Sequence, residues 1–313
     1  MATLREFAAR HRVPLPSGLE GDRYMFRDFP HFIQQWMACL SSLGDPADFT
    51  RLAEEFCEDE AAQGVRYAEV HFSLPEHGDR LGRWEAPIEA VLEGFDRGGA
   101  RHAIPCRLVV DAVRGIDLGL SRRAMEVAVR YRDAGVVALG LGGSERFAPR
   151  SYAQIFREAC DAGLHSVPHA GESAGPESIR AALEELDAER VGHGIRILED
   201  SGLVAEVRDR GVALDVCPTS NVMTRVVASI EAHPLPHMLA AGLRITLNSD
   251  DPAMFSSPLA GEYELARRVF GLDDEALADL ARSSVHASFA DELVKSRLIT
   301  EIDAWLAQGH STA

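Results

Sequence analysis

One phrase recurs along this chain and constrains its fold more than any other feature. It consists of a helix end, a glycine, a short apolar strand and a group of polar residues. The four clear copies are DAGVVALGLGGSE (133–145), DAGLHSVPHAGE (161–172), DRGVALDVCPTSN (209–221) and AAGLRITLNSDDP (240–252). Each glycine stands where a helix can end in a left-handed residue, which glycine adopts at least cost. The nearly continuous apolar strands are typical of parallel strands covered on both faces.

Weaker copies of the phrase complete a series of strands that alternate with helices. We predict seven parallel strands, which begin near Val65, Ile104, Val136, His165, Val191, Val212 and Arg244. Polar residues follow nearly every strand, which favours a (β/α)8 TIM barrel. A doubly wound open sheet is the alternative, but its chemistry usually gathers at a single switch point. We expect one domain over residues 1–313, with the first strand of the barrel missing from the chain.

Composition excludes several classes of partner. No run of about 18 apolar residues occurs, and the N-terminus has no apolar signal-peptide centre, so we expect no membrane contact. The net charge of −17 argues against nucleic acid as a partner, because binding a phosphate backbone needs clustered Lys and Arg. Five scattered cysteines without CxxC spacing predict no disulfide framework, which fits a cytoplasmic location. Composition leaves the oligomeric state open.

Five candidate residues for chemistry follow the predicted strands. They are His169 and Glu172 in PHAGE, His193 in VGHG, and Asp250 and Asp251 in NSDDP. Each alone has an ordinary structural explanation, since a histidine can be hydrogen-bonded in the core and Asp-Asp-Pro is a good helix N-cap. All five stand at the same end of parallel strands. Together they offer metal ligands, a proton donor and a base that orients water.

The motifs PHAGE, VGHG, CPTSN and NSDDP resemble, in order and spacing, the adenosine deaminase family of metal-dependent amidohydrolases. RYAEV, GLGGSE and the C-terminal SVHASFADELVKSRLITEIDAWL are similar to that family as well. The resemblance covers almost the whole chain. It implies that the protein is a hydrolase that uses one zinc ion per chain to replace the 6-amino group of a purine nucleoside by oxygen.

The same resemblance implies a role for each candidate residue. His169 and Asp250 would ligate zinc, and Glu172 would donate a proton to the purine ring nitrogen beside the reacting carbon. His193 and Asp251 would orient and deprotonate the attacking water. The backbone N–H of Gly143 would hold the purine, together with Asp251. Protonation of the ring makes the reacting carbon electrophilic, so that attack by water expels ammonia.

The chain departs from the family at two places. It contains no His-x-His, the motif whose two imidazoles are also zinc ligands in the family. The opening ATLREFAARHRVPLP resembles the helix that follows that motif, so we expect the chain to begin just after it. A start placed too far downstream competes with a naturally metal-poor relative, and the retained Glu172, His193, Asp250 and Asp251 favour the first. His71 stands where the family usually has Arg, but one imidazole cannot replace two, so we expect a packing role.

Adenosine or a close analogue is the leading substrate. Aminodeoxyfutalosine is the closest alternative, because GLGGSE and DDPAMF resemble relatives that act in menaquinone synthesis. The contacts that distinguish the two are expected around Phe26, Phe29, Phe32 and Trp36, which can serve both packing and binding. Two other functions compete with deamination. One is a non-catalytic barrel that binds purine, and the other is ester or amide hydrolysis, against which Glu172 beside His169 argues.

Overall fold

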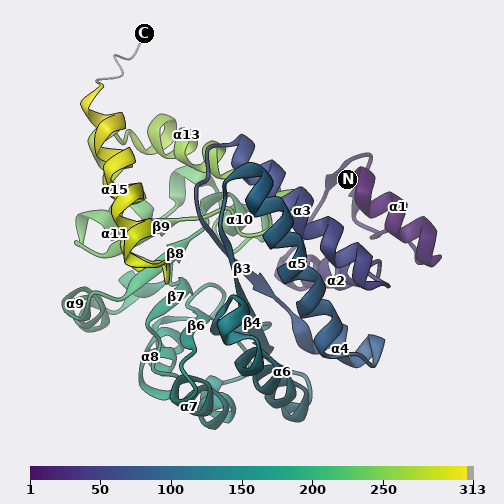
Figure 1. Ribbon diagram of the computed structural model, residues 1–313. Helices are drawn as coiled ribbons and strands as arrows, with labels where there is room; N and C mark the ends of the chain where they lie inside the picture. Colours follow the sequence, from purple (N-terminus) through teal and green to yellow (C-terminus); the bar gives the residue numbers. More distant parts are fainter. Residues whose placement is uncertain (309–313) are drawn as a thin grey trace.

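A computed structural model describes residues 1–308 of the chain, and the predicted domain boundary at residue 313 lies outside them. Seven parallel strands form one curved sheet in the order β3-β4-β5-β6-β7-β8-β9, with helices around it (Figure 1). The strands are β3 (Ala68–Phe72), β4 (Cys106–Val113), β5 (Val136–Gly142), β6 (His165–Ala170), β7 (Arg190–His193), β8 (Ala213–Val216) and β9 (Arg244–Leu247). The predicted strand order, parallel direction and barrel-type fold are confirmed.

The helices lie before, between and after the strands. They are α1 (Ala2–His11), α2 (Phe29–Leu40), α3 (Pro46–Ala62), α4 (Leu74–Leu81), α5 (Glu85–His102), α6 (Leu118–Arg130), α7 (Ala153–Asp161), α8 (Pro176–Glu185), α9 (Ser201–Arg210), α10 (Pro218–Met223), α11 (Leu235–Ala240), α12 (Pro252–Phe255), α13 (Leu259–Phe270), α14 (Asp274–Ala287) and α15 (Glu292–Ala307). A short antiparallel pair, β1 (Leu19–Glu20) and β2 (Arg23–Tyr24), connects α1 to α2. No helix within residues 1–308 is both long and apolar enough to cross a membrane.

The sheet is curved but does not close within residues 1–308. Strand β3 pairs only with β4, and β9 pairs only with β8. The space between β3 and β9, which we call the seam, corresponds to the position where the missing first strand was expected. Helix α14 packs against β9 on one side of the seam, and α15 packs on α14 (Figure 1).

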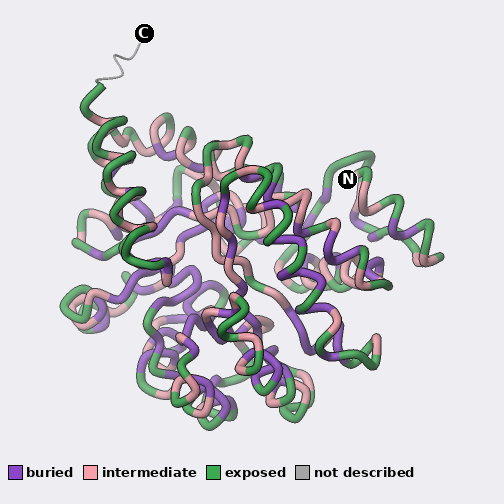
Figure 2. Tube along the Cα trace, viewed as in Figure 1, coloured by how far each residue is buried: buried purple, intermediate pink, exposed green. Residues whose placement is uncertain are grey.

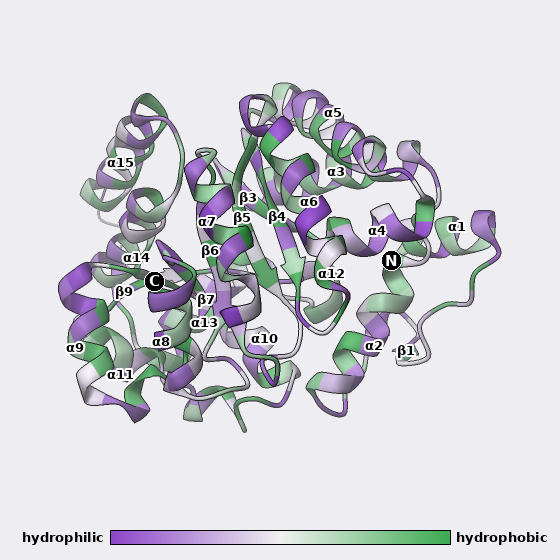
Figure 3. Cartoon of the chain, turned by 90° about the horizontal axis from the view of Figure 1, so that it is seen from below, coloured by the Kyte–Doolittle hydropathy of each residue, from purple (hydrophilic) through white to green (hydrophobic). Residues whose placement is uncertain are grey.

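Two large apolar clusters lie between the sheet and the surrounding helices. The first packs β4 and β5 against α3, α5, α6 and α7, and the second packs β6 to β9 against α8, α9, α11 and α14. Figure 2 shows that most residues of the strands are buried. Figure 3 shows that apolar residues concentrate on the strands and on the helix faces that cover them. The inside of the curved sheet holds only a thin apolar layer of Val109, Ala138 and Val167. The polar site therefore lies above this layer, at the carboxyl ends of the strands.

Candidate active site

All of the predicted site residues line one cavity of about 1400 Å³, which extends from the seam, where α14 and α15 line it, to the carboxyl ends of the strands. Strands β5, β6, β7 and β9 each contribute through the residues at or just beyond their ends. The lining includes Gly143, His169, Glu172, His193, Asp250 and Asp251. The expectation that they share one pocket agrees with this placement, while their individual roles remain predictions.

Glu172 and His193 form a buried part of the cavity wall. Their side chains are 7% and 4% exposed, and His193 Nε2 lies 3.8 Å from Glu172 Oε2. Burial raises the pKa of Glu172 to about 7, with a further contribution from the negative charge of Asp250. A carboxyl group with this pKa still holds its proton near neutral pH, which is the state a general acid needs.

The loop that carries Glu172 is fixed by a second glutamate, Glu145. Its carboxylate accepts hydrogen bonds from the backbone N–H groups of Gly171 (2.7 Å), Glu172 (2.9 Å) and Ser173 (2.7 Å). The hydroxyl of Ser178, at the start of α8, also donates to it. Burial opposes ionisation of Glu145, but these hydrogen bonds outweigh burial and lower its pKa. Glu145 is therefore an anionic clamp that sets where Glu172 stands.

His193 is held by a chain of hydrogen bonds that fixes its tautomer. The backbone N–H of Leu235 donates to Nδ1 of His233 (3.1 Å), so the proton of this neutral ring is on Nε2. Burial lowers the pKa of His233 to about 4, which keeps it neutral. Its Nε2 donates to Asn221 Oδ1 (3.2 Å), and the Asn221 amide then donates to Nδ1 of His193 (3.3 Å). In neutral His193 the proton must consequently lie on Nε2, which faces Glu172.

Asp250 and Asp251 follow β9 at the mouth of the cavity. Asp250 has a positive φ of 58°, a conformation uncommon outside glycine, and its Oδ2 accepts a hydrogen bond from Ser220 Oγ at 2.6 Å. Burial and the charge of Asp250 raise the pKa of Asp251 well above its usual range, while a hydrogen bond with Trp36 opposes that shift. The turn brings both carboxyl groups to one pocket.

His169 lies near the centre of the cavity floor. Burial, with the charges of His71 and His193, lowers its pKa to about 3, so the ring is neutral. Its Nδ1 is buried and has no hydrogen-bond partner. The groups that could hold a metal ion place His169 with His71 and Asp111, and Asp250 with His193 and Cys217. No such group within residues 1–308 contains both His169 and Asp250. Their joint role as ligands stays a prediction.

Gly143 follows β5 in a backbone conformation that requires glycine. Its φ is +86°, and a Cβ there would lie 3.0 Å from the carbonyl oxygen of Arg114. The Arg114 guanidinium donates to the carbonyl oxygens of Leu141 (3.2 Å) and His169 (2.8 Å). Arg114 thus joins the ends of β4, β5 and β6 beneath the proposed purine contact.

Sequence reasoning missed several residues that position this site. Glu145 and Asn221 close two of the repeated phrases, so their place after a strand was a usable signal. Asp111 and Arg114 could have been found by the same signal, because Asp111 lies near the carboxyl end of β4 and Arg114 comes directly after that strand. His233 lies in a connecting segment and carried no comparable signal. The aromatic residues expected near the substrate, including Phe29, Phe32 and Trp36, do line the cavity, whereas Phe26 packs behind them against Phe32 and Phe255.

Comparison with known proteins gives consistent matches over the whole chain. A family model described as adenosine deaminase matches residues 2–305. An aminodeoxyfutalosine deaminase of Streptomyces coelicolor is 40% identical over 313 residues, which cover 96% of this chain and 81% of that protein. An adenine deaminase of a Chelativorans species is 35% identical and covers 96% and 93%. The crystal structure of an adenine deaminase from Arthrobacter aurescens superposes with a TM-score of 0.88 at 30% identity, covering 98% and 94%.

Proposed function

The chain belongs to the adenosine deaminase family, which makes it a hydrolase acting on a cyclic amidine, and we propose that it deaminates a 6-aminopurine nucleoside. One observation carries this proposal beyond the family. Glu172 is a buried carboxyl group whose pKa is about 7, and it is clamped in a cavity large enough for a nucleoside. Ring-nitrogen protonation needs such a donor, whereas ester hydrolysis does not.

The chain's own residues account for binding and proton transfer. The backbone N–H of Gly143 holds the purine, and Glu172 delivers its proton to the ring nitrogen beside the reacting carbon. Water attacks that carbon, and the amino group leaves as ammonia. His193 presents its Nε2–H to the water and the developing oxygen, because Asn221 occupies its other nitrogen. Asp251 accepts the proton that the water loses and passes it to the departing amino group.

The donor groups of the cavity fit a metal ion. His169 has a neutral ring and a buried Nδ1 without a partner, and Asp250 offers a carboxylate at the cavity mouth. We propose that His169 and Asp250 contribute to holding one zinc ion per chain. When bound, zinc would activate water near neutral pH and offset the charge of Asp250.

The relatives favour the alternative substrate over adenosine itself. Two aminodeoxyfutalosine deaminases of Streptomyces species are 40% and 39% identical to this chain, and an adenine deaminase is 35% identical. We therefore propose aminodeoxyfutalosine first and adenosine second. Both share the aminopurine, so the aromatic residues of α2 that line the cavity, Phe29, Phe32 and Trp36, are the proposed contacts for the group beyond it.

A substrate panel tests this proposal. Aminodeoxyfutalosine, adenosine, adenine and AMP are compared by their kcat/KM values on zinc-supplemented protein, with ammonia release as a second readout. We expect aminodeoxyfutalosine to rank first and AMP last, because the strongly acidic chain disfavours an added phosphate. A higher kcat/KM for AMP than for every neutral substrate contradicts the assignment. Tight purine binding without ammonia release would indicate the non-catalytic alternative.

A further inference from the structure

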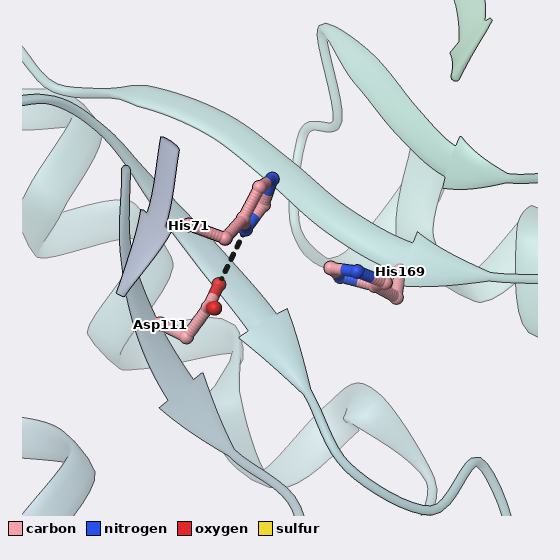
Figure 4. Close-up of side chains that lie close together, drawn as sticks. All are labelled: His71, Asp111 and His169. Carbon is pink, nitrogen blue, oxygen red and sulfur yellow. Dashed lines mark hydrogen bonds and ion pairs between the residues drawn. The ribbon is translucent and has the colours of Figure 1, made fainter. Parts of the chain in front are cut away.

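Three potential metal ligands from strands β3, β4 and β6 meet inside the cavity. They are His71 of β3, Asp111 of β4 and His169 of β6, and one ligand atom from each lies within 4.8 Å of the others. His71 Nδ1 is 2.9 Å from Asp111 Oδ1, and the rings of His71 and His169 are 4.9 Å apart between centroids. Figure 4 shows His169 pointing across the cavity towards the His71–Asp111 pair.

A glycine on the intervening strand leaves room for this cluster. Strand β5 runs between β4 and β6, and its Gly140 is in register with Asp111. A Cβ at Gly140 would lie 2.0 Å from Asp111 Oδ1 and 3.1 Å from the imidazole of His71. Any larger residue at this position would displace the carboxylate. The space in which His71, Asp111 and His169 meet therefore exists because Gly140 has no side chain.

Not every polar atom of His71, Asp111 and His169 has a hydrogen-bond partner within the protein. The buried Nδ1 of His169 has no partner, although unpaired buried polar atoms are uncommon and costly in folded proteins. Asp111 is 7% exposed, while the side chain of His71 keeps 31% of its surface open to the cavity. An ion arriving from the cavity can thus reach His71 directly.

We propose that His71, Asp111 and His169 are the primary ligands of a divalent metal ion, best suited to Zn²⁺. Two imidazoles and one carboxylate form a ligand set that catalytic zinc sites use, with a fourth position left open. The ion takes the place of the proton between His71 and Asp111, and that proton passes to solvent. Asp111 thereby supplies an anionic ligand beside the imidazole of His71.

This inference rests on the proposed function, because it names further residues for the same metal. It changes the expected role of His71 from packing to coordination. It also adds Asp111, and it removes Asp250 from the ligands given under the proposed function, of which it keeps His169. Asp250 lies next to His193 and Ser220.

Zinc titration of metal-free protein against a chromophoric chelator tests the proposal, and Co²⁺ absorption reports the coordination number. We expect His71→Ala and Asp111→Ala each to weaken Zn²⁺ binding by at least about tenfold, since even outer-shell changes cost that much. Gly140→Ala should weaken binding similarly while retaining all three ligands. His165→Ala is the matched control. His165 is on the same strand as His169, but it lies outside the cavity lining and pairs with Glu189. Its affinity should equal that of the unmodified protein.

Asp250→Asn separates this inference from the proposed function. If the inference is correct, this variant keeps its zinc affinity within about threefold. Unchanged affinity in His71→Ala and Asp111→Ala, with zinc lost in Asp250→Asn, overturns the inference and leaves the proposed function intact. Failure of the unmodified protein to bind zinc also overturns it. Zinc binding that follows the inference, combined with no deamination of any substrate in the panel, contradicts the proposed function alone. Unfolding midpoints in urea verify that each variant is folded.

Discussion

On the β6–β7 side of the cavity, the side chains of Glu172 and His193 are 7% and 4% exposed, and hydrogen bonds with Glu145 and Asn221 hold the two residues. On the side of the seam, the side chains of His71 and Asp250 are 31% and 21% exposed. The first side is preorganised for proton transfer, because its donors and acceptors are already held in place. The second side faces the open edges of β3 and β9. It offers ligand atoms whose positions can adjust when an ion or a substrate binds.

Replacement of the proton donor on the rigid side should have the largest effect. Glu172→Gln keeps the shape of the side chain but removes the transferable proton, so kcat should fall by about 10²–10⁴-fold. Zinc affinity should not change, because Glu172 is not among the proposed ligands. Glu177→Gln, in the first turn of α8 and outside the cavity lining, serves as the control. Loss of zinc with retained turnover would show that the assigned role is wrong.

Removal of the Glu145 carboxylate should destabilise the loop that carries Glu172. In Glu145→Ala several hydrogen bonds to a charged acceptor are lost together, at about 1.5–3 kcal/mol each, so the free energy of unfolding should fall by at least about 3 kcal/mol. Urea denaturation measures this change. Glu177→Ala removes a carboxylate with a single backbone partner, Gly175, and should cost much less. Equal losses in the two variants would mean that Glu145 is no clamp.

The pH profile should report the burial of Glu172. Its pKa is raised to about 7, so the proton donor is lost as pH rises through that value. We expect kcat to fall about tenfold for each pH unit above about 7. The sign for stability is the same, because a carboxyl pKa above its unfolded value stabilises the fold at low pH and loses that contribution between about pH 4.5 and 7. A basic limb that is unchanged in Glu172→Asp would assign the titration to another group.

The tautomer of His193 offers a smaller but direct test. Asn221→Asp replaces a donor to Nδ1 by an acceptor, so the proton should move to Nδ1 and turnover should fall about tenfold. Ring nitrogen shifts of isotope-labelled histidine distinguish the two tautomers. Asn248→Asp adds the same charge in the same cavity without contacting His193, and should leave those shifts unchanged. Protonation of Nδ1 in the unmodified protein at high pH would contradict the proposed hydrogen-bond chain.

The smallest effect is expected where the cavity opens towards α2. Trp36→Phe keeps an aromatic wall but removes the indole N–H that interacts with Asp251. We expect KM to rise about threefold with kcat nearly unchanged, because a single hydrogen bond is lost and water can partly replace it. Steady-state kinetics separate the two constants. A loss in kcat larger than that of Asn221→Asp would place Trp36 within the rigid part of the site.

The strands were predictable because their signal is local. All seven begin within three residues of the positions predicted from apolar runs and glycines. Helix α3 likewise begins at Pro46, directly after Asp45, with a capping box, which is a local pattern. Of the site, only the polar residues that directly follow an apolar strand could be predicted from the sequence. The bonds of Glu145 to Gly171 and of Asn221 to His193 span 26 and 28 residues. Those pairings depend on how strands curve and on which way side chains point, which no local pattern records.

Glu145 has a mechanical consequence for the reaction. It stands two residues after Gly143 and accepts a hydrogen bond from the backbone N–H of Glu172, so it connects the proposed purine contact to the proposed proton donor. Widening of the cavity at the seam would therefore leave the spacing between these two groups unchanged. Entry of a bulky ligand past β3 and β9 and delivery of a proton by Glu172 would then depend on different parts of the molecule.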